Sequence, residues 1–297
     1  MEIKLAAGDI TQIEVDGIVV ELFEGVKQLG EATAAVDKAL GGAIEHLISS
    51  GEIKGKTGEV SIIHTLGKLP ARVVAVAGLG KRQKFNVDRV RIAAGDSCRT
   101  LRKLNCHKVA TILIGAGVGD IKPETAAEAI VEGSLLGLYS FTRYKKPEHE
   151  DIEEILIVER ETSKSAALEQ SIHKGKIMAE ATRLARDMVN EPANCMTPSQ
   201  MAEATREIAS KHNLGFNVLD SNDIETMGMG ALLGVSKGSN EPPKLIILSY
   251  KGDVDSHNTI GFIGKGITFD SGGISIKPSE GLAEMKDDMA GGAAVIA

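Results

Sequence analysis

The sequence is poor in aromatic residues and has no excess of positive charge. It contains no tryptophan, and aromatic residues make up only 3% of its 297 positions. Its formal net charge is −7. General nucleic-acid binding relies on a basic field and on aromatic side chains that stack on bases. We therefore expect no broad nucleic-acid interface, although a local basic patch stays open.

Cysteine and histidine are also used sparingly. The three cysteines, Cys98, Cys106 and Cys195, are an odd number and lack the spacing of metal ligands. We expect reduced thiols rather than a disulfide framework. The histidines are scattered, and His149-Glu150 lacks the second histidine of a helical zinc motif. A metal site built on histidine is therefore not expected.

Long apolar runs are absent too. The first residues do not form a basic segment followed by an apolar core, and no stretch approaches the apolar length of a membrane span. Hydrophobic residues make up 42% and charged residues 25%, as in ordinary globular proteins. The composition predicts a soluble, cytoplasmic protein without a membrane partner, and its length allows two domains.

Residues 1–160 show the pattern of an α/β domain. Short apolar runs alternate with longer amphipathic runs, as in strands interleaved with helices. Strands are expected at 2–6, 16–22, 59–65, 72–77, 108–114 and 153–159, and helices at 32–49, 87–104 and 123–142. A charged, proline-containing segment at 145–154 marks the clearest shift in composition. We therefore predict one α/β domain at 1–160.

Residues 161–297 begin with a long helical pattern that should link two domains. It stops near Asn190, because Pro192 disfavours helix at the residue before it. A second helix is expected from Thr197, the N-cap, to about His212. Further along, strands are expected at 244–250 and 259–264, and a helix at 290–297.

Three glycine-containing segments invite comparison with phosphate-binding loops. AGLGK (77–81) and IGAGVGD (114–120) each follow an expected strand, but the second reads G-x-G-x-G and no helix follows it at once. GKT (55–57) lacks the first glycine of a P-loop and follows a helix instead of a strand. We interpret the first two as ordinary turns and set the third aside as a phosphate loop.

The stretch 264–292 gathers charged residues in a glycine-rich loop that follows an apolar run. Such a loop at the carboxyl end of a strand is the usual place for a ligand site in an α/β sheet. Asp270 and Asp288 could hold divalent ions, and Lys265 could ligate a metal once its amine is neutral. Residue types alone, however, favour a solvated charged loop.

This stretch, GKGITFDSGGISIKPSEGLAEMKDDMAGGAAV (264–295), resembles the signature region of the leucyl aminopeptidase family, also called cytosol aminopeptidases or peptidase family M17. The resemblance extends through VNEPANCMTPSQMA (189–202) and GMGALLGVSKGSNEPPKLIILSYKG (228–252). It implies an N-terminal macro-like α/β domain at 1–160. A long helix would join it to the first part of an α/β metallopeptidase domain within 161–297.

The resemblance implies a metal-dependent aminopeptidase that releases N-terminal amino acids, with leucine-type preference, from peptides that have a free N-terminus. Two divalent ions, manganese or zinc, with magnesium or cobalt as alternatives, would activate a water molecule. By motif position, Lys265 and Asp288 correspond to metal ligands, and Asp270 to the carboxylate that both ions share. Asp287 falls on a variable position of the family pattern, so Asp288 is chosen over it.

Two further roles follow from the same resemblance. Lys277 corresponds to the lysine that polarises the substrate carbonyl, and Met285 to a residue lining the pocket for the first side chain. The family completes its site with an N-T-D-A-E-G-R motif, whose arginine holds a bicarbonate base, and this sequence does not contain it. Three of the five expected protein ligands are present.

We therefore expect a chain truncated within the catalytic domain and inactive as a peptidase by itself. Formation of the family's homohexamer should be impaired, and metal binding by the chain alone is left open.

Two other hypotheses about the function of the chain remain. The chain could be a non-catalytic binding or assembly module that contacts a nucleotide or DNA through its N-terminal domain, although its acidic balance argues against DNA. It could also be an inactive paralogue.

Overall fold

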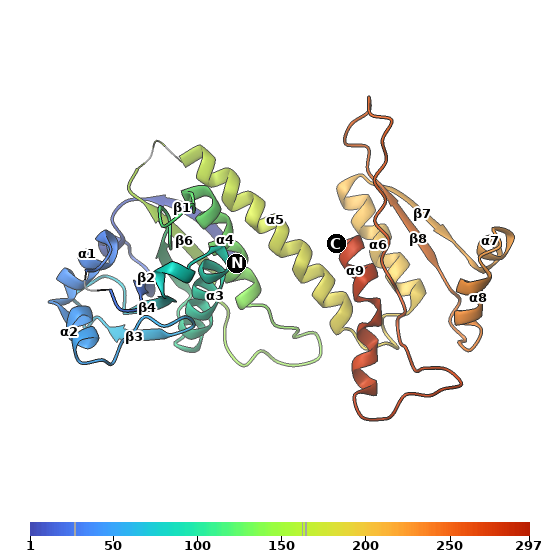
Figure 1. The fold of residues 1–297 in the computed structure, drawn as a ribbon, viewed down its shortest axis with the longest axis horizontal. Helices are drawn as coiled ribbons and strands as arrows, with labels where there is room; N and C mark the ends of the chain where they lie inside the picture. The colour runs from blue at the N-terminus through green and yellow to red at the C-terminus, as the bar shows by residue number, and fades with distance from the viewer. Residues whose placement is uncertain (27, 162, 164) are drawn as a thin grey trace. The chain divides into compact units, whose positions relative to one another are not determined.

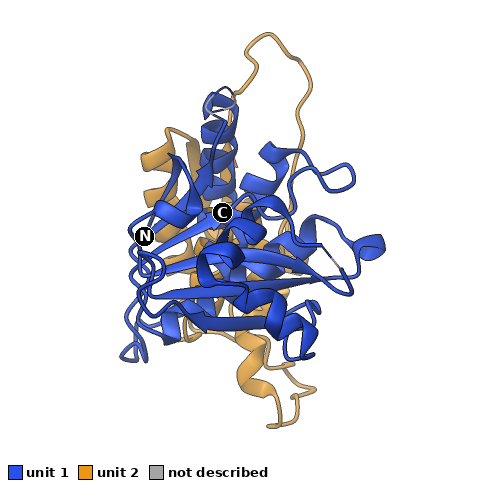
Figure 2. Cartoon of the chain, turned by 90° about the vertical axis from the view of Figure 1, so that its left-hand side faces the viewer, with its two compact units in different colours: residues 1–180 blue, residues 181–297 orange. Residues whose placement is uncertain are grey.

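The computed structural model describes residues 1–26, 28–161, 163 and 165–297. The chain divides into two compact units, unit 1 at residues 1–180 and unit 2 at residues 181–297 (Figure 2). The division falls inside the long helix α5, Ser165–Asn190, and the role of this helix as a linker stays a prediction. A domain boundary at residue 160 stays a prediction. Residues 162 and 164, at the start of the expected helical pattern, lie outside the described residues.

Unit 1 follows the expected alternation of strands and helices (Figure 1). Its elements are β1 (Glu2–Ala7), η1 (Ile10–Gln12), β2 (Gly17–Phe23), α1 (Glu31–Leu40), α2 (Ala43–Ser49), β3 (Val60–His64), β4 (Val73–Gly80), η2 (Arg82–Lys84), α3 (Val87–Lys103), β5 (Lys108–Ile112), α4 (Pro123–Gly137), β6 (Glu154–Glu159) and the first part of α5. The strands form one six-stranded sheet in the order β1-β6-β5-β2-β4-β3. All neighbours pair in parallel except β3 and β4. The predicted α/β class is thus confirmed.

Helices cover both faces of this sheet. Successive side chains of a strand point to opposite faces, so each strand contributes to two hydrophobic cores. In β2, Ile18 and Val20 belong to the core under α1 and α2, whereas Val19 belongs to the core under α3, α4 and α5. All eight residues of β4 are buried. A run that is apolar at every position is typical of a parallel strand covered on both faces.

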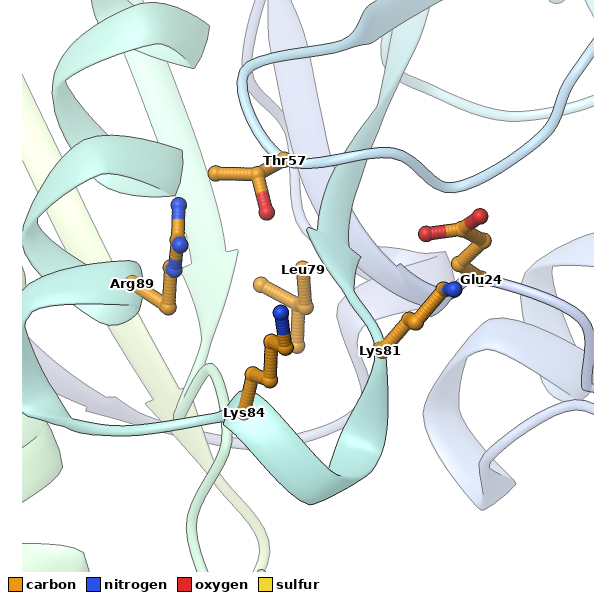
Figure 3. A pocket seen from close by; sticks show the side chains of 6 residues that line it. All are labelled: Glu24, Thr57, Leu79, Lys81, Lys84 and Arg89. Atoms are coloured by element: carbon orange, nitrogen blue, oxygen red, sulfur yellow. The ribbon is translucent and has the colours of Figure 1, made fainter.

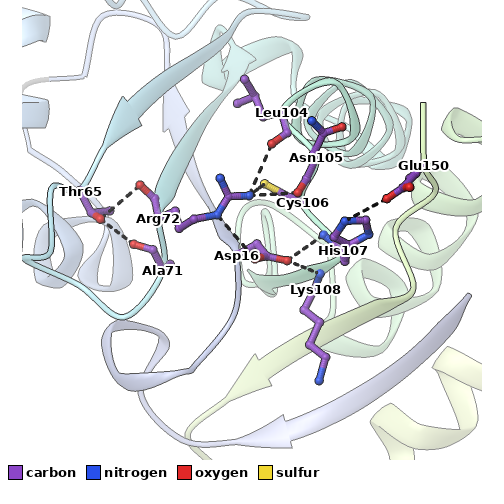
Figure 4. Close-up of polar contacts among 10 residues, drawn as sticks. All are labelled: Asp16, Thr65, Ala71, Arg72, Leu104, Asn105, Cys106, His107, Lys108 and Glu150. Atoms are coloured by element: carbon purple, nitrogen blue, oxygen red, sulfur yellow. Dashed lines mark hydrogen bonds and ion pairs between the residues drawn. The ribbon is translucent and has the colours of Figure 1, made fainter. Parts of the chain in front are cut away.

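A charged network ties together the loops that precede β2, β4 and β5 (Figure 4). The Asp16 carboxylate accepts hydrogen bonds from the backbone N–H groups of His107 at 2.7 Å and Lys108 at 2.9 Å. Arg72 Nε lies 3.6 Å from the same carboxylate, and its Nη2 donates to the Asn105 carbonyl at 3.0 Å. Burial opposes the charge on Asp16, but these backbone donors and Arg72 outweigh it and lower its pKa.

Two expected helices of unit 1 were too long. The predicted helix 32–49 is two helices, because Gly41 and Gly42 adopt left-handed conformations with φ of 76° and 82°. The predicted helix 123–142 ends at Gly137, where the Leu138 carbonyl accepts a hydrogen bond from Arg102 Nη1 at 2.9 Å. The first run is thus stopped by two consecutive glycines, and the end of the second is held by a contact between residues 36 positions apart.

Unit 2 contains the end of α5 and a second, smaller sheet. Its elements are α6 (Pro198–His212), β7 (Gly215–Leu219), α7 (Ser221–Thr226), α8 (Gly230–Ser236), β8 (Leu245–Ser249), η4 (Leu282–Met289) and α9 (Ala290–Ile296). Strands β7 and β8 pair antiparallel. As predicted, Thr197 caps α6, and its hydroxyl accepts from the Gln200 N–H at 3.3 Å. The helices α7 and α8 were not predicted, although Asp220 and Asp223 form a capping box at the start of α7.

The expected strand at 259–264 is wrong. In the part of the chain that the structure describes, no segment pairs with it. The side chains of Ile260, Phe262 and Ile263 are 80%, 79% and 98% exposed. A strand requires a neighbour that satisfies its backbone groups, and an apolar sequence alone does not supply one.

Among the described residues, no helix has the length and apolar character needed to cross a membrane.

Candidate active site

The loop at 264–292 turns back on itself at two consecutive glycines. Gly272 and Gly273 have φ values of 90° and 71°, which residues with a side chain rarely adopt. A Cβ atom on Gly272 would lie 2.3 Å from the Ser275 carbonyl oxygen. The Lys277 N–H donates to the Ser271 carbonyl at 2.9 Å and closes the turn. The turn therefore returns Lys277 to the side of the loop where Asp270 lies.

Close backbone packing holds the start of the loop against α9. A Cβ atom on Gly264 would lie 2.3 Å from the Gly291 carbonyl oxygen. The Gly292 N–H donates to the Lys265 carbonyl at 2.7 Å. Because only glycine allows this approach, Lys265 lies beside the junction of η4 and α9, where Asp288 is found.

The five predicted site residues form one cluster within unit 2. Lys265 Nζ lies 2.7 Å from Asp288 Oδ2, and Lys277 Nζ lies 2.7 Å from Asp270 Oδ2. Lys277 Nζ also donates to Met285 Sδ at 2.9 Å, and the Asp270 N–H donates to the Met285 carbonyl at 3.3 Å. Two lysine–aspartate ion pairs and one methionine are thus brought together.

These ion pairs change the proton affinities of two of their members. The hydrogen bond from Lys265 to Asp288 raises the pKa of Lys265, and the charge of Asp270 adds to this effect. The hydrogen bond from Lys277 lowers the pKa of Asp270, assisted by the Gly272 N–H and by the charge of Lys265. At neutral pH Lys265 is therefore protonated and Asp270 ionised.

The structure separates the adjacent Asp287 and Asp288. Asp287 is exposed, whereas the Asp288 side chain is 22% exposed and faces Lys265. No role was predicted for Lys286, yet its Nζ donates a hydrogen bond to the Asn190 carbonyl at 2.7 Å and ties η4 to the end of α5. Helix C-termini attract lysines through their unpaired carbonyls, but no local pattern indicates a partner 96 positions away.

The donor atoms of this cluster suit a hard divalent ion in kind. Asp270 and Asp288 offer carboxylate oxygens, and an ammonium group occupies the position beside each carboxylate that a cation would take. These two carboxylates are fewer ligands than a divalent ion takes, so they form only part of a ligand set. Nowhere in the described part of the chain do three His, Cys, Asp or Glu side chains gather as metal ligands do.

Two of the three cysteines, Cys98 and Cys106, are buried and lie far from this cluster in sequence. Cys98 and Cys106 are buried and Cys195 is exposed, all three as free thiols. Burial raises the pKa of Cys98 to about 11. A thiol with so high a pKa is a weak nucleophile at neutral pH, so Cys98 is a structural residue.

Comparison with protein families assigns both halves of the chain. Residues 19–148 match the N-terminal domain of the cytosol aminopeptidase family, and residues 183–297 match its catalytic domain. A probable cytosol aminopeptidase of Alkaliphilus metalliredigens (strain QYMF) is 41% identical over 300 residues, and one of Alkaliphilus oremlandii (strain OhILAs) is 40% identical over 299. Each alignment covers 100% of this chain and 60% of the relative.

Two solved structures share the fold. The bottromycin maturation enzyme BotP in complex with Mn is 30% identical with a TM-score of 0.76, over 95% of this chain and 55% of that one. A mutant of tomato leucine aminopeptidase has a TM-score of 0.83 at 23% identity, over 100% of this chain and 58% of that one, and this likeness concerns the fold alone. With its two domain matches in order along the sequence, the chain belongs to the cytosol aminopeptidase family.

Proposed function

We propose that this chain carries part of the site of a metal-dependent aminopeptidase, which releases N-terminal residues of leucine type from peptides. The observation that carries the proposal is the clustering of Lys265, Asp270, Lys277, Met285 and Asp288 within one unit. Its two Alkaliphilus relatives are probable cytosol aminopeptidases, which supports the same reaction class. The chain spans about 60% of those relatives, so the activity belongs to the longer protein.

In this proposal Lys265, Asp270 and Asp288 hold two divalent ions. Such ions supply Lewis acidity and lower the pKa of water. Manganese is the first candidate, because BotP was solved with Mn, and zinc, magnesium or cobalt are alternatives. Lys265 must lose its proton to become a ligand, and its raised pKa in the pair with Asp288 opposes that loss. Ligation therefore requires a divalent ion to displace the proton from the Lys265 amine.

Lys277 would stabilise negative charge on the oxygen of the reacting carbonyl. An ammonium group in a fixed position lowers the energy of the oxyanion that forms during amide cleavage. To reach a substrate oxygen, Lys277 has to leave the Asp270 carboxylate, 2.7 Å from its Nζ. Met285, whose sulfur lies 2.9 Å from the same Nζ, would line the pocket for the first side chain of the peptide.

We further propose that the 297-residue chain does not hydrolyse peptides by itself. Two carboxylates and one amine are fewer donors than hard divalent ions prefer, and they leave two dications poorly neutralised. In the complete enzyme, further carboxylates and an arginine-held bicarbonate would finish the site.

The test measures release of leucine from leucine amide with added manganese. We expect the purified chain to stay at the level of the blank, while the full-length Alkaliphilus metalliredigens relative serves as the positive control. Release by the 297-residue chain that is lost in a Lys277→Ala variant would refute its inactivity. In parallel, manganese titration of the chain and of an Asp270→Asn variant measures metal binding without activity, and equal binding by both would argue against the ligand role of Asp270.

Location and assembly follow the same proposal. We propose a cytoplasmic enzyme that acts on peptides with a free N-terminus and forms a homohexamer in its full-length form. Unit 2 leaves large apolar side chains such as Phe262 and Ile263 in solvent, which favours altered association of the chain alone. Light scattering that shows a clean hexamer of the 297-residue chain would contradict this expectation.

A further inference from the structure

A cavity in unit 1 lies outside the candidate active site. It has a volume of about 210 Å³. Its lining residues are Glu24, Thr57, Leu79, Lys81, Lys84 and Arg89 (Figure 3). The parallel neighbours β2 and β4 end at this cavity, because Glu24 directly follows β2 and Lys81 directly follows β4. Ligands of open α/β sheets bind at this edge, the carboxyl ends of the strands.

The cavity is positively charged in a chain that is negative as a whole. It has three cationic side chains against one carboxylate, while the chain carries a formal charge of −7. Among the described residues, the side chains of Lys81, Lys84 and Arg89 have no ion-pair or hydrogen-bond partner. Figure 3 shows the Lys84 ammonium and the Thr57 hydroxyl pointing toward each other, with the Arg89 guanidinium beside them. An anion between them would relieve the repulsion among these cations.

Aromatic contacts fix the turn that carries the two lysines. The rings of Phe23 and Phe85 meet edge to face with centroids 5.0 Å apart. The Arg82 guanidinium lies 5.6 Å from the centroid of the Phe23 ring. Because these contacts hold η2 on both sides, Lys81 and Lys84 are presented from a supported backbone rather than from a free loop.

Glycines bring a second segment onto the end of β4. The Gly80 N–H donates to the Gly55 carbonyl at 2.8 Å. A Cβ atom on Gly78 would lie 2.0 Å from the Lys56 carbonyl oxygen, and one on Gly80 would lie 2.2 Å from Thr57 Oγ1. The segments 55–57 and 77–81, which are unconnected glycine turns in the sequence, therefore meet here and place a hydroxyl next to the cations.

We propose that this cavity binds the phosphate group of a small phosphate ester. Lysine and arginine are the side chains that bind phosphate through charge-assisted hydrogen bonds, and Thr57 adds a neutral donor. Glu24 accepts a hydrogen bond from a hydroxyl group of the same ester. The cavity is smaller than the roughly 300–1,000 Å³ of sites for drug-sized ligands, so it encloses the phosphate and its neighbouring atoms only. This site is independent of the proposed aminopeptidase function.

Calorimetric titration of the 297-residue chain at low salt tests the proposal. The probes are inorganic phosphate, glucose 6-phosphate and adenosine monophosphate. We expect both esters to bind more tightly than inorganic phosphate, and Lys84→Gln and Arg89→Gln each to weaken ester binding about tenfold. The matched control is Lys103→Gln at the other end of α3, roughly 21 Å from Arg89 along the helix. It should leave binding unchanged, and thermal unfolding verifies that each variant folds.

The same titrations distinguish the sources of the phosphate. Tighter binding of adenosine monophosphate than of glucose 6-phosphate indicates a nucleotide, and equal binding indicates recognition of the ester head alone. Absence of ester binding overturns the proposal, as does equal weakening by Lys103→Gln and Lys84→Gln. Binding of a short DNA duplex that depends on Lys84, without binding of either ester, would overturn it in favour of nucleic acid.

Discussion

Unit 1 buries its apolar strands, whereas unit 2 leaves a comparable apolar run in solvent. In β4 of unit 1 every residue is buried between two layers of helices. At 259–264 in unit 2, the large apolar side chains are at least 79% exposed. The best-buried cluster of unit 2 consists of Met188, Met201, Met289 and Ala293. β4 also pairs with β2 and β3, whereas no described segment pairs with the run at 259–264. The comparison shows that an apolar run forms a strand only where a partner satisfies its backbone groups.

The largest expected effect comes from one substitution made in both regions. Ile18 in β2 is 0% exposed and Ile263 is 98% exposed. Ile18→Ala should lower the free energy of unfolding by about 2–5 kcal/mol, because it removes buried methyl groups and leaves a cavity. Ile263→Ala should change it by less than about 0.5 kcal/mol. Urea unfolding followed by circular dichroism measures both variants.

An equal loss of stability in Ile263→Ala and Ile18→Ala would contradict the difference in burial between the two units. Such an outcome would mean that Ile263 is buried in solution, for example between copies of the chain. Repeating the measurement at a tenfold lower protein concentration separates these cases, since burial between copies weakens on dilution.

The sequence predicts unit 1 well because its signals are local. The alternating strand and helix patterns and Pro123 at the start of α4 act within a few residues. The cap at Thr197, a local signal of the same kind, was predicted in unit 2. The break at Gly41-Gly42 was also readable in principle, because two consecutive glycines after a helical run are a typical helix end. The run at 259–264 misled the prediction because strand formation depends on a partner strand, which the run itself does not reveal.

For the candidate site, too, the residues within one stretch of sequence were predicted, and the contacts between distant segments were not. The residue types and order at 264–292 indicate Lys265, Asp270, Lys277 and Asp288 through their resemblance to one family, and the structure gathers them. The contact from Lys286 to the end of α5 and the cavity of unit 1 join segments far apart in the chain. Such contacts are products of the fold, and no single stretch of sequence contains them.

A smaller effect is expected from two glycines of the run at 259–264 that differ in their surroundings. A Cβ atom on Gly264 would lie 2.3 Å from the Gly291 carbonyl oxygen, whereas one on Gly261 meets nothing within 4 Å. Gly264→Ala should therefore destabilise unit 2 by about 1–3 kcal/mol through overpacking and should disturb the hydrogen bond between Lys265 and Gly292. Gly261→Ala should have almost no effect.

Amide NMR shifts of Gly292, together with urea unfolding, check this pair of variants. An unchanged Gly292 shift in Gly264→Ala would show that the loop does not pack on α9 in solution. That result would extend the difference between the two units, because even the site loop would then lack a fixed position.

The smallest effect concerns how each unit stabilises a carboxylate. In unit 1, backbone N–H groups contribute more than Arg72 to lowering the pKa of Asp16, against the opposing effect of burial. In unit 2, the hydrogen bond from Lys277 contributes most to lowering the pKa of Asp270. For both groups the folded pKa lies below the ordinary value of 3.8. The stability they contribute is therefore complete above that value and is lost as the pH falls through the folded pKa.

Removing the side-chain cation should therefore affect the two carboxylates unequally. Lys277→Met should raise the pKa of Asp270 toward 3.8, because only the Gly272 N–H and the charge of Lys265 still lower it. Arg72→Met should raise the pKa of Asp16 less, because the backbone donors remain in place. Carboxyl carbon NMR shifts followed between pH 2 and pH 6 give both values. A larger pKa change at Asp16 than at Asp270 would mean that Arg72, and not the backbone N–H groups, chiefly stabilises the Asp16 carboxylate. The two units would then stabilise their carboxylates in the same way, through a side-chain cation.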